Sequence, residues 1–111
     1  MSYKVAFASS DGKVVNQHFG KAKKFLVFQI GDNGAEYLET RDNKPHFQGC
    51  EYHEETMEEL VNLISDCKAV FVTNIGYVAL AVLKVNGIRA FEAPYYINEI
   101  IERVLSSTFK I

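Results

Sequence analysis

The chain has 111 residues, and its 12 Lys and Arg against 14 Asp and Glu give a formal net charge of −2. This length predicts a single domain over residues 1–111, and the near-neutral charge argues against a nucleic-acid binder that relies on a basic face. The two cysteines are too few for a four-thiolate metal site or a disulfide framework within one chain. No apolar run reaches membrane-spanning length and the N-terminus lacks a signal-peptide pattern, so we expect a cytoplasmic protein without membrane association.

The chain begins with a segment that is predicted to be a strand over residues 3–9, because it is almost continuously apolar. Ser-Asp-Gly at 10–12 indicates a turn, and a short extended piece is predicted at 13–16. An irregular loop at 17–20 then ends in glycine. The residues before 24 therefore predict one strand, a short extended piece and an irregular loop.

A hairpin is predicted next, since an apolar strand at 24–30 and a partner strand at 35–41 flank the Gly-Asp-Asn-Gly turn at 31–34. The partner strand carries polar residues on both faces, which is typical of an exposed edge strand. Residues 42–52 have no periodicity and predict a long loop, a kind of segment that often carries function.

The second half of the chain alternates helices and strands. They are predicted as a helix from about residue 53, a strand at 68–73, a helix at 77–85, a strand at 88–93 and an amphipathic helix from 97 to 105. In the first of these helices the apolar residues Met57, Leu60, Val61 and Ile64 form one stripe. The helix at 77–85 is apolar almost all round, so we expect it to be well buried.

This element order predicts an α/β fold with a mixed sheet of about five strands and helices on its faces. Ligands usually bind at the C-terminal edge of parallel strands in such sheets. That edge is expected to hold Ser9 and Ser10, the turn from Asn74 to Gly76, and residues 92–94. Backbone N–H groups of the turn between Asn74 and Gly76 can bind an anion, although a simple strand-to-helix turn is the commoner interpretation.

The histidines are the residues that suggest a ligand site. His46, Cys50 and His53 place two imidazoles and one thiol within eight residues of the long loop, and these are ligands suited to Zn, Fe, Cu or an iron–sulfur species. His18 lies in a separate loop, where Gly20 allows close backbone approach. If the two loops meet, they supply up to four ligands; the alternative is that these are solvated loop histidines.

The second cysteine, Cys67, continues the apolar stripe of the first helix. This position predicts a buried structural thiol rather than a redox partner of Cys50, because the chain has no Cys-x-x-Cys motif.

Enzyme chemistry finds little support in the sequence. The strands at 3–9 and 68–73 contain none of the carboxylates that a two-metal nuclease needs at strand ends. The phosphate-binding glycine motifs and the nucleophile-elbow motif are also absent. We therefore expect a protein that is not an enzyme and has no catalytic residues.

The segment at 15–25 reads VNQHFGKAKKF and contains the pattern His-Phe-Gly-x-Ala-x-x-Phe. It resembles the signature of the dinitrogenase iron–molybdenum cofactor biosynthesis family, which comprises the NifX and NafY proteins and the C-terminal domain of NifB. The similarity continues in chain order through residues 4–13, 37–41, 64–70, 74–76 and 86–88.

This resemblance implies a three-layer α/β/α fold with a ribonuclease-H-like motif but no nuclease activity. It also implies a role in binding, storing or handing on iron–sulfur clusters that become the nitrogenase cofactor, with cofactor-assembly or iron–sulfur proteins as partners. The family's cluster-contacting histidine corresponds to His18. Family members often carry a cysteine in the loop that here holds Cys50, in a related but different sequence context. The chain lacks the three-cysteine radical-SAM motif of NifB, so cluster synthesis by that chemistry is excluded.

Together these observations predict a carrier that holds an iron–sulfur cluster or a precursor of the iron–molybdenum cofactor transiently. His18 and Cys50 are the expected metal ligands, and His46 and His53 assist them. Because neutral imidazole and thiolate are the binding forms, affinity is expected to fall at low pH. The alternative is a metal-free regulatory or protein-docking module, which would use the edge strand at 35–41 and the pair at 95–96.

Overall fold

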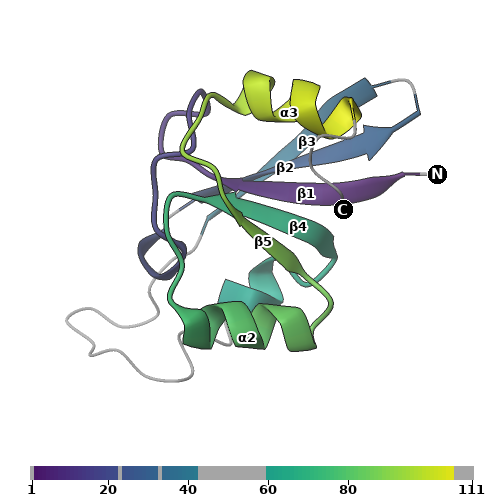
Figure 1. Cartoon of the computed structure of the whole chain (residues 1–111). Helices are drawn as coiled ribbons and strands as arrows, with labels where there is room; N and C mark the ends of the chain where they lie inside the picture. The colour runs from purple at the N-terminus through teal and green to yellow at the C-terminus, as the bar shows by residue number, and fades with distance from the viewer. Residues whose placement is uncertain (1, 23, 33, 43–59, 107–111) are drawn as a thin grey trace.

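The computed structural model describes residues 2–22, 24–32, 34–42 and 60–106. Within these ranges it has a five-stranded sheet, two α-helices and a short 3-10 helix, and residues 60–63 are also helical. In chain order the elements are β1 (Tyr3–Ala8), η1 (Phe19–Lys21), β2 (Lys24–Gly31), β3 (Gly34–Asp42), β4 (Cys67–Val72), α2 (Tyr77–Val85), β5 (Arg89–Glu92) and α3 (Ile97–Leu105) (Figure 1). None of the helices in these ranges combines the length and apolar character needed to cross a membrane.

The strands form one mixed sheet in the order β3-β2-β1-β4-β5. β1 lies at the centre, antiparallel to β2 and parallel to β4, and β4 is parallel to β5. The β2–β3 hairpin pairs Gly31 with Gly34, so the turn between them has two residues, and β3 is an edge strand. The predicted α/β class, mixed five-stranded sheet, hairpin and edge strand are all confirmed.

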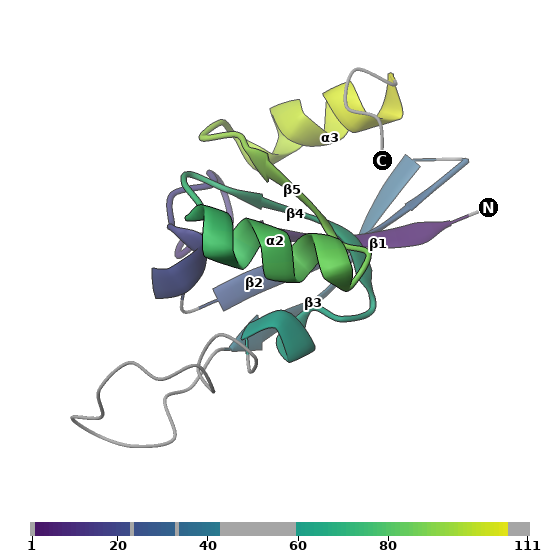
Figure 2. The same ribbon diagram turned by 60° about the horizontal axis from the view of Figure 1, so that its bottom comes forward.

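Helices cover both faces of the sheet, with α2 and α3 on opposite sides (Figures 1 and 2). Successive residues of β1 point to opposite faces, because side chains alternate along a strand. Ala6 and Ala8 pack in one apolar cluster with residues 60–64 and α2, and Val5 and Phe7 pack in another with α3. The ribonuclease-H-like description stays a prediction.

The prediction for α2 is confirmed in its bounds but wrong in its burial. Only Ala79 and Leu83 of this helix are buried, whereas Val78 is 66% exposed and Val85 is 86% exposed. A nine-residue helix that lies on one face of a sheet contacts it along one side, whatever the composition of its other side. Gly87, which follows the C-cap residue Asn86, has a φ of 76°, the left-handed conformation that glycine favours after a helix end.

Two smaller expectations also need correction. Cys67 does not continue a helix: residues 64–66 form a turn, and Cys67 is the first residue of β4. Its predicted burial is confirmed, and burial together with the neighbouring Asp66 carboxylate raises the pKa of its thiol to about 12. The extended piece predicted at 13–16 is reduced to a single bridge between Val14 and Tyr96.

A row of aromatic rings crosses the sheet on the α3 face, with one ring from each strand. In spatial order the row consists of Tyr37, Phe28, Phe7, Phe71 and Phe91. Neighbouring ring centroids are 5.0 to 5.6 Å apart, in stacked or edge-to-face arrangements that aromatic pairs favour. The row ties all five strands together beneath α3.

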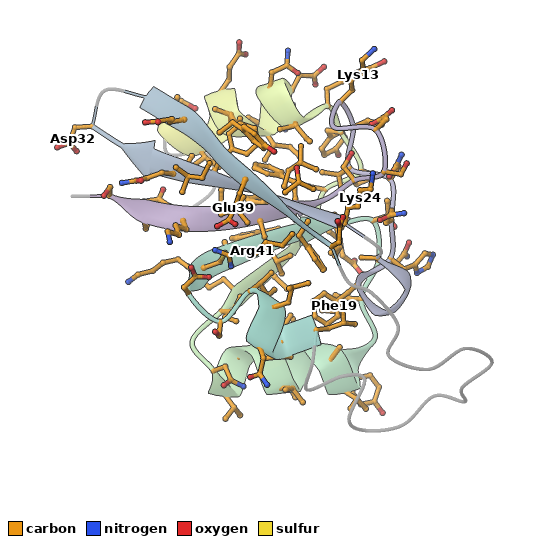
Figure 3. The ribbon with its side chains drawn as sticks, turned by 180° about the vertical axis from the view of Figure 1, so that it is seen from behind. Lys13, Phe19, Lys24, Asp32, Glu39 and Arg41 are labelled. Carbon is orange, nitrogen blue, oxygen red and sulfur yellow. The ribbon has the colours of Figure 1, made fainter. Side chains whose placement is uncertain are left out.

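Arg41 of β3 joins the sheet edge to the turn before β4. Its guanidinium donates two hydrogen bonds to the Asp66 carboxylate, of 2.6 and 2.9 Å, and one of 2.9 Å to the Leu63 carbonyl. Glu39 and Arg41 lie side by side on β3 in Figure 3, and Glu39 accepts a further bond from Arg41. These bonds hold the pKa of Asp66 well below its usual range, and Lys4 adds to the effect.

Asp66→Asn is expected to lower stability at neutral pH and to have little effect in acid. A carboxyl group whose pKa is depressed by folding contributes stability above its unfolded pKa of about 3.9, and this contribution is lost as the pH falls toward its folded value. Because the Asp66 side chain is 43% exposed, solvent screening limits the effect to ~1 kcal/mol or less. Urea unfolding of both proteins at about pH 7, pH 4 and pH 2 measures it.

The matched control is Asp32→Asn, which changes the same charge in the hairpin turn, away from Arg41 (Figure 3). A destabilisation by Asp66→Asn that stays the same across this pH range would contradict the assignment to the Arg41 ion pair.

Candidate functional site

The candidate site is the C-terminal edge of the parallel strands, where ligands usually bind in sheets of this kind. The backbone of Ala93, just after β5, donates a hydrogen bond of 2.8 Å to the Val72 carbonyl at the end of β4. The loop that follows β1 crosses this edge, because the Thr73 N–H donates to the Gln17 carbonyl at 3.0 Å. The ends of β1, β4 and β5 are therefore brought together here.

His18 is exposed, but its backbone is held on both sides. Before it, Gln17 accepts the hydrogen bond from Thr73; after it, the Phe19 N–H donates to the Asn74 carbonyl at 3.1 Å. Phe19 is fully buried at the start of η1, near the ring of Phe25, and anchors the loop in the core (Figure 3). The sequence pair His-Phe thus presents a polar side chain on a fixed backbone.

The first part of the same loop is ordered by its own polar side chains. The Asp11 carboxylate accepts hydrogen bonds from the N–H groups of Lys13 and Val14, which lower its pKa. Asn16 pairs with Ser10 twice, accepting from its backbone N–H and donating to its hydroxyl. These contacts fix the chain just before His18.

The turn from Asn74 to Gly76 has a partner that the sequence interpretation missed. The Ile75 N–H donates a 3.1 Å hydrogen bond to the Glu92 carboxylate at the end of β5. One of the amides considered for anion binding is therefore already engaged by a carboxylate of the chain itself. The only signal in the sequence was that both segments end neighbouring parallel strands.

Two glycines at the site leave open space beside the backbone. Apart from the adjoining backbone, no atom of the described residues would lie within 4 Å of a Cβ atom built at Gly20 or Gly76. Gly76 has an extended backbone with a φ of −69° and precedes α2 without a side-chain cap. The space that the sequence analysis expects at Gly20 is present in the structure; its use by a ligand stays a prediction.

The other predicted ligands, His46, Cys50 and His53, lie outside the described residues. Their convergence with His18 therefore stays a prediction. Within ranges 2–22, 24–32, 34–42 and 60–106, no cluster of three or more His, Cys, Asp or Glu side chains could hold a metal ion. Of the predicted ligand set, the structure places His18, Gly20, Asn74 and Gly76 at one edge of the sheet.

Comparisons with known proteins concern the family and the fold. The family model described as "Dinitrogenase iron-molybdenum cofactor" matches residues 1–107. The FeMo cofactor biosynthesis protein NifB of Frankia alni is 33% identical over 91 residues, which cover 79% of this chain and 18% of NifB. Protein NifX of Azotobacter vinelandii is 29% identical over 86 residues, covering 78% of this chain and 53% of NifX.

The chain thus spans about a fifth of that NifB and about half of that NifX. Among solved structures, the crystal structure of PH0822 superposes with a TM-score of 0.74 at 23% sequence identity. The superposition covers 97% of this chain and 95% of that one. At this identity the likeness establishes the fold alone.

Proposed function

The chain belongs to the dinitrogenase iron–molybdenum cofactor family, and on that premise we propose that it is a non-catalytic carrier of an iron–sulfur cluster or cofactor precursor. It binds this cargo loosely through His18 and Cys50 and passes it to a cofactor-assembly or iron–sulfur protein. His46 and His53, which lie close to Cys50 in the sequence, assist the binding.

The observation that carries this proposal is the state of His18. His18 is exposed, while the Gln17 carbonyl before it and the Phe19 N–H after it are hydrogen-bonded to the turn after β4. A ligand residue held in this way loses little backbone conformational entropy when it binds, so one side chain can contribute usefully to affinity. Neutral imidazole is a suitable ligand for iron.

The state of Cys67 supports the choice of Cys50 as the thiolate ligand. Cys67 is buried, and with its pKa raised to about 12 it stays a thiol at neutral pH. Since the chain has only two cysteines, Cys50 is the thiol that remains for the cargo. One thiolate and few imidazoles suit a carrier, which must release what it binds.

Two carboxylates at the site favour a binding role over hydrolysis. Asp11 accepts hydrogen bonds from backbone N–H groups of its own loop, and Glu92 accepts one from Ile75. Carboxylates engaged in this way order the backbone, whereas two-metal hydrolysis requires carboxylates that hold metal ions.

Anaerobic titration with an iron–sulfur cluster, followed by visible absorbance, tests the proposal. His18→Ala and Cys50→Ala are each expected to weaken binding by about tenfold or more, because each removes a direct ligand. Cys67→Ala is the matched control, since it removes a thiol of the core and should leave cluster affinity unchanged. Equal binding by all four proteins would overturn the assignment of ligands, and failure of the wild-type protein to bind would overturn the carrier function.

A metal-free docking module remains the second candidate, and exposed aromatic side chains favour it. Tyr95 is 45% exposed and Tyr96, which forms the bridge with Val14, is 57% exposed. Anaerobic purification followed by elemental analysis separates the two functions. A colourless protein without iron, which takes up no cluster and loses a protein partner on Tyr95→Ser with Tyr96→Ser, would support the docking module.

A further inference from the structure

We propose that Glu92 is a positioning residue for His18, acting through the turn that follows β4. The expected effect of Glu92 on cargo binding rests on the proposed function, whereas its effect on the backbone around His18 rests on the geometry alone. Glu92 and His18 are 74 positions apart in the sequence, and the structure connects them through three consecutive residues of one turn.

The first step of the connection is the placement of Glu92 itself. Glu92 is the last residue of β5, and it pairs in register with Val72, the last residue of β4. The hydrogen bond from the next residue, Ala93, to the Val72 carbonyl closes the ladder at 2.8 Å. The backbone of Glu92 is thus fixed beside the point where the turn leaves β4.

The second step is the turn. From its fixed backbone, the Glu92 carboxylate accepts the Ile75 N–H at 3.1 Å. Ile75 follows Asn74, whose carbonyl belongs to the same peptide group as the Ile75 N–H. Because a peptide group is planar, the hydrogen bond to Glu92 that orients the Ile75 N–H orients the Asn74 carbonyl as well.

The third step is His18. The oriented Asn74 carbonyl accepts the Phe19 N–H at 3.1 Å, and the preceding Thr73 N–H donates to the Gln17 carbonyl at 3.0 Å. These two bonds flank His18 in the sequence. The peptide group between Asn74 and Ile75 therefore donates its N–H to Glu92 and accepts, through its carbonyl, the hydrogen bond from the loop that carries His18.

A competing role for Glu92 is to stabilise α2. This helix has no side-chain cap at Gly76 and no acidic residue in its first turn, so a carboxylate near its start is electrostatically favourable. That role depends on the charge of Glu92, whereas positioning depends on a hydrogen-bond acceptor. Glu92→Gln keeps an acceptor oxygen and removes the charge, and Glu92→Ala removes both.

The first experiment measures amide hydrogen exchange at Ile75 and Phe19 in the protein without cargo. Glu92→Ala is expected to speed exchange at both amides by about tenfold, because the peptide plane loses its restraint, and Glu92→Gln is expected to stay within about threefold of wild type. Glu102→Ala, which removes an exposed carboxylate of α3 on the other face of the sheet, is the matched control. Unchanged exchange at Phe19 in Glu92→Ala would overturn the proposal.

The second experiment measures cluster affinity by anaerobic titration in a double-mutant cycle with His18→Ala. Glu92→Ala is expected to weaken binding about fivefold in the wild-type background and to have no effect in the His18→Ala background, with rescue by Glu92→Gln. An equal effect in both backgrounds would overturn the action through His18. Should wild type bind no cluster, the carrier function fails, and the exchange at Phe19 still decides the positioning.

Discussion

Phe19→Ala is expected to lower the free energy of unfolding by about 3–5 kcal/mol, although Phe19 lies outside the sheet and the α-helices, beside an exposed residue. Its ring is fully buried in the apolar cluster on the α2 face, with the Phe25 ring at a centroid distance of 6.1 Å. Truncation to alanine leaves a cavity among core side chains that the sheet and helices cannot close. Urea unfolding at neutral pH measures the loss.

The same substitution is expected to reduce cluster binding, because Phe19 also anchors the backbone bond to Asn74 that fixes His18. His18→Ala is the control in the adjacent position: it removes an exposed side chain, so its cost in stability should be within about 0.5 kcal/mol. A loss of stability in His18→Ala comparable to that in Phe19→Ala would contradict this division between anchor and ligand.

The pattern of apolar residues is sufficient to predict most of the fold. The Gly-Asp-Asn-Gly turn indicated the β2–β3 hairpin, and the alternation of strands and helices after residue 67 indicated the parallel half of the sheet. Helices α2 and α3 have the bounds that the sequence predicts; Gly76 and Gly87 flank α2, and Pro94 interrupts the chain before α3. These features are local, and local sequence determines them.

Burial of α2 and the place of Cys67 could not be predicted in the same way. The composition of α2 shows that the helix is apolar. Its burial depends on what packs against each side, and Val78 and Val85 face away from the sheet. Cys67 is spaced as a helix residue would be, although the chain has already turned at residues 64–66 and entered β4. The period of apolar residues shows which side chains share a face of one helix or strand, but it does not show where the next helix or strand begins.

The candidate site shows the same division between local and long-range information. His18 stands out by its residue type and by the His-Phe-Gly pattern around it. Glu92 has no local signal, because its role depends on a hydrogen bond to a turn 17 residues earlier in the chain. Such a contact follows from the register of β4 and β5, which pairs Glu92 with Val72. A residue that positions a metal-ligating side chain is for this reason harder to find in a sequence than the ligating residue itself.

Phe7→Ala is expected to be about as damaging as Phe19→Ala, at about 3–5 kcal/mol, but without a direct effect on the site. Phe7 is fully buried at the centre of the aromatic row, 5.0 Å from the Phe71 ring and 5.3 Å from the Phe28 ring. Its loss opens a cavity between the central strand and α3, and it also removes two aromatic contacts. Since the free energy of unfolding of such domains is about 5–15 kcal/mol, Phe7→Ala is expected to remove a large share of it.

Phe91→Ala is the matched control at the end of the same row, because Phe91 is only partly buried on the edge strand β5. Its expected cost is about 1–2 kcal/mol, and Phe7→Leu, which keeps most of the apolar volume, should recover much of the loss in Phe7→Ala. Urea denaturation of the three variants ranks them. If Phe91→Ala were as costly as Phe7→Ala, the row would act as one cooperative unit across the sheet, and burial of each ring would not determine its contribution.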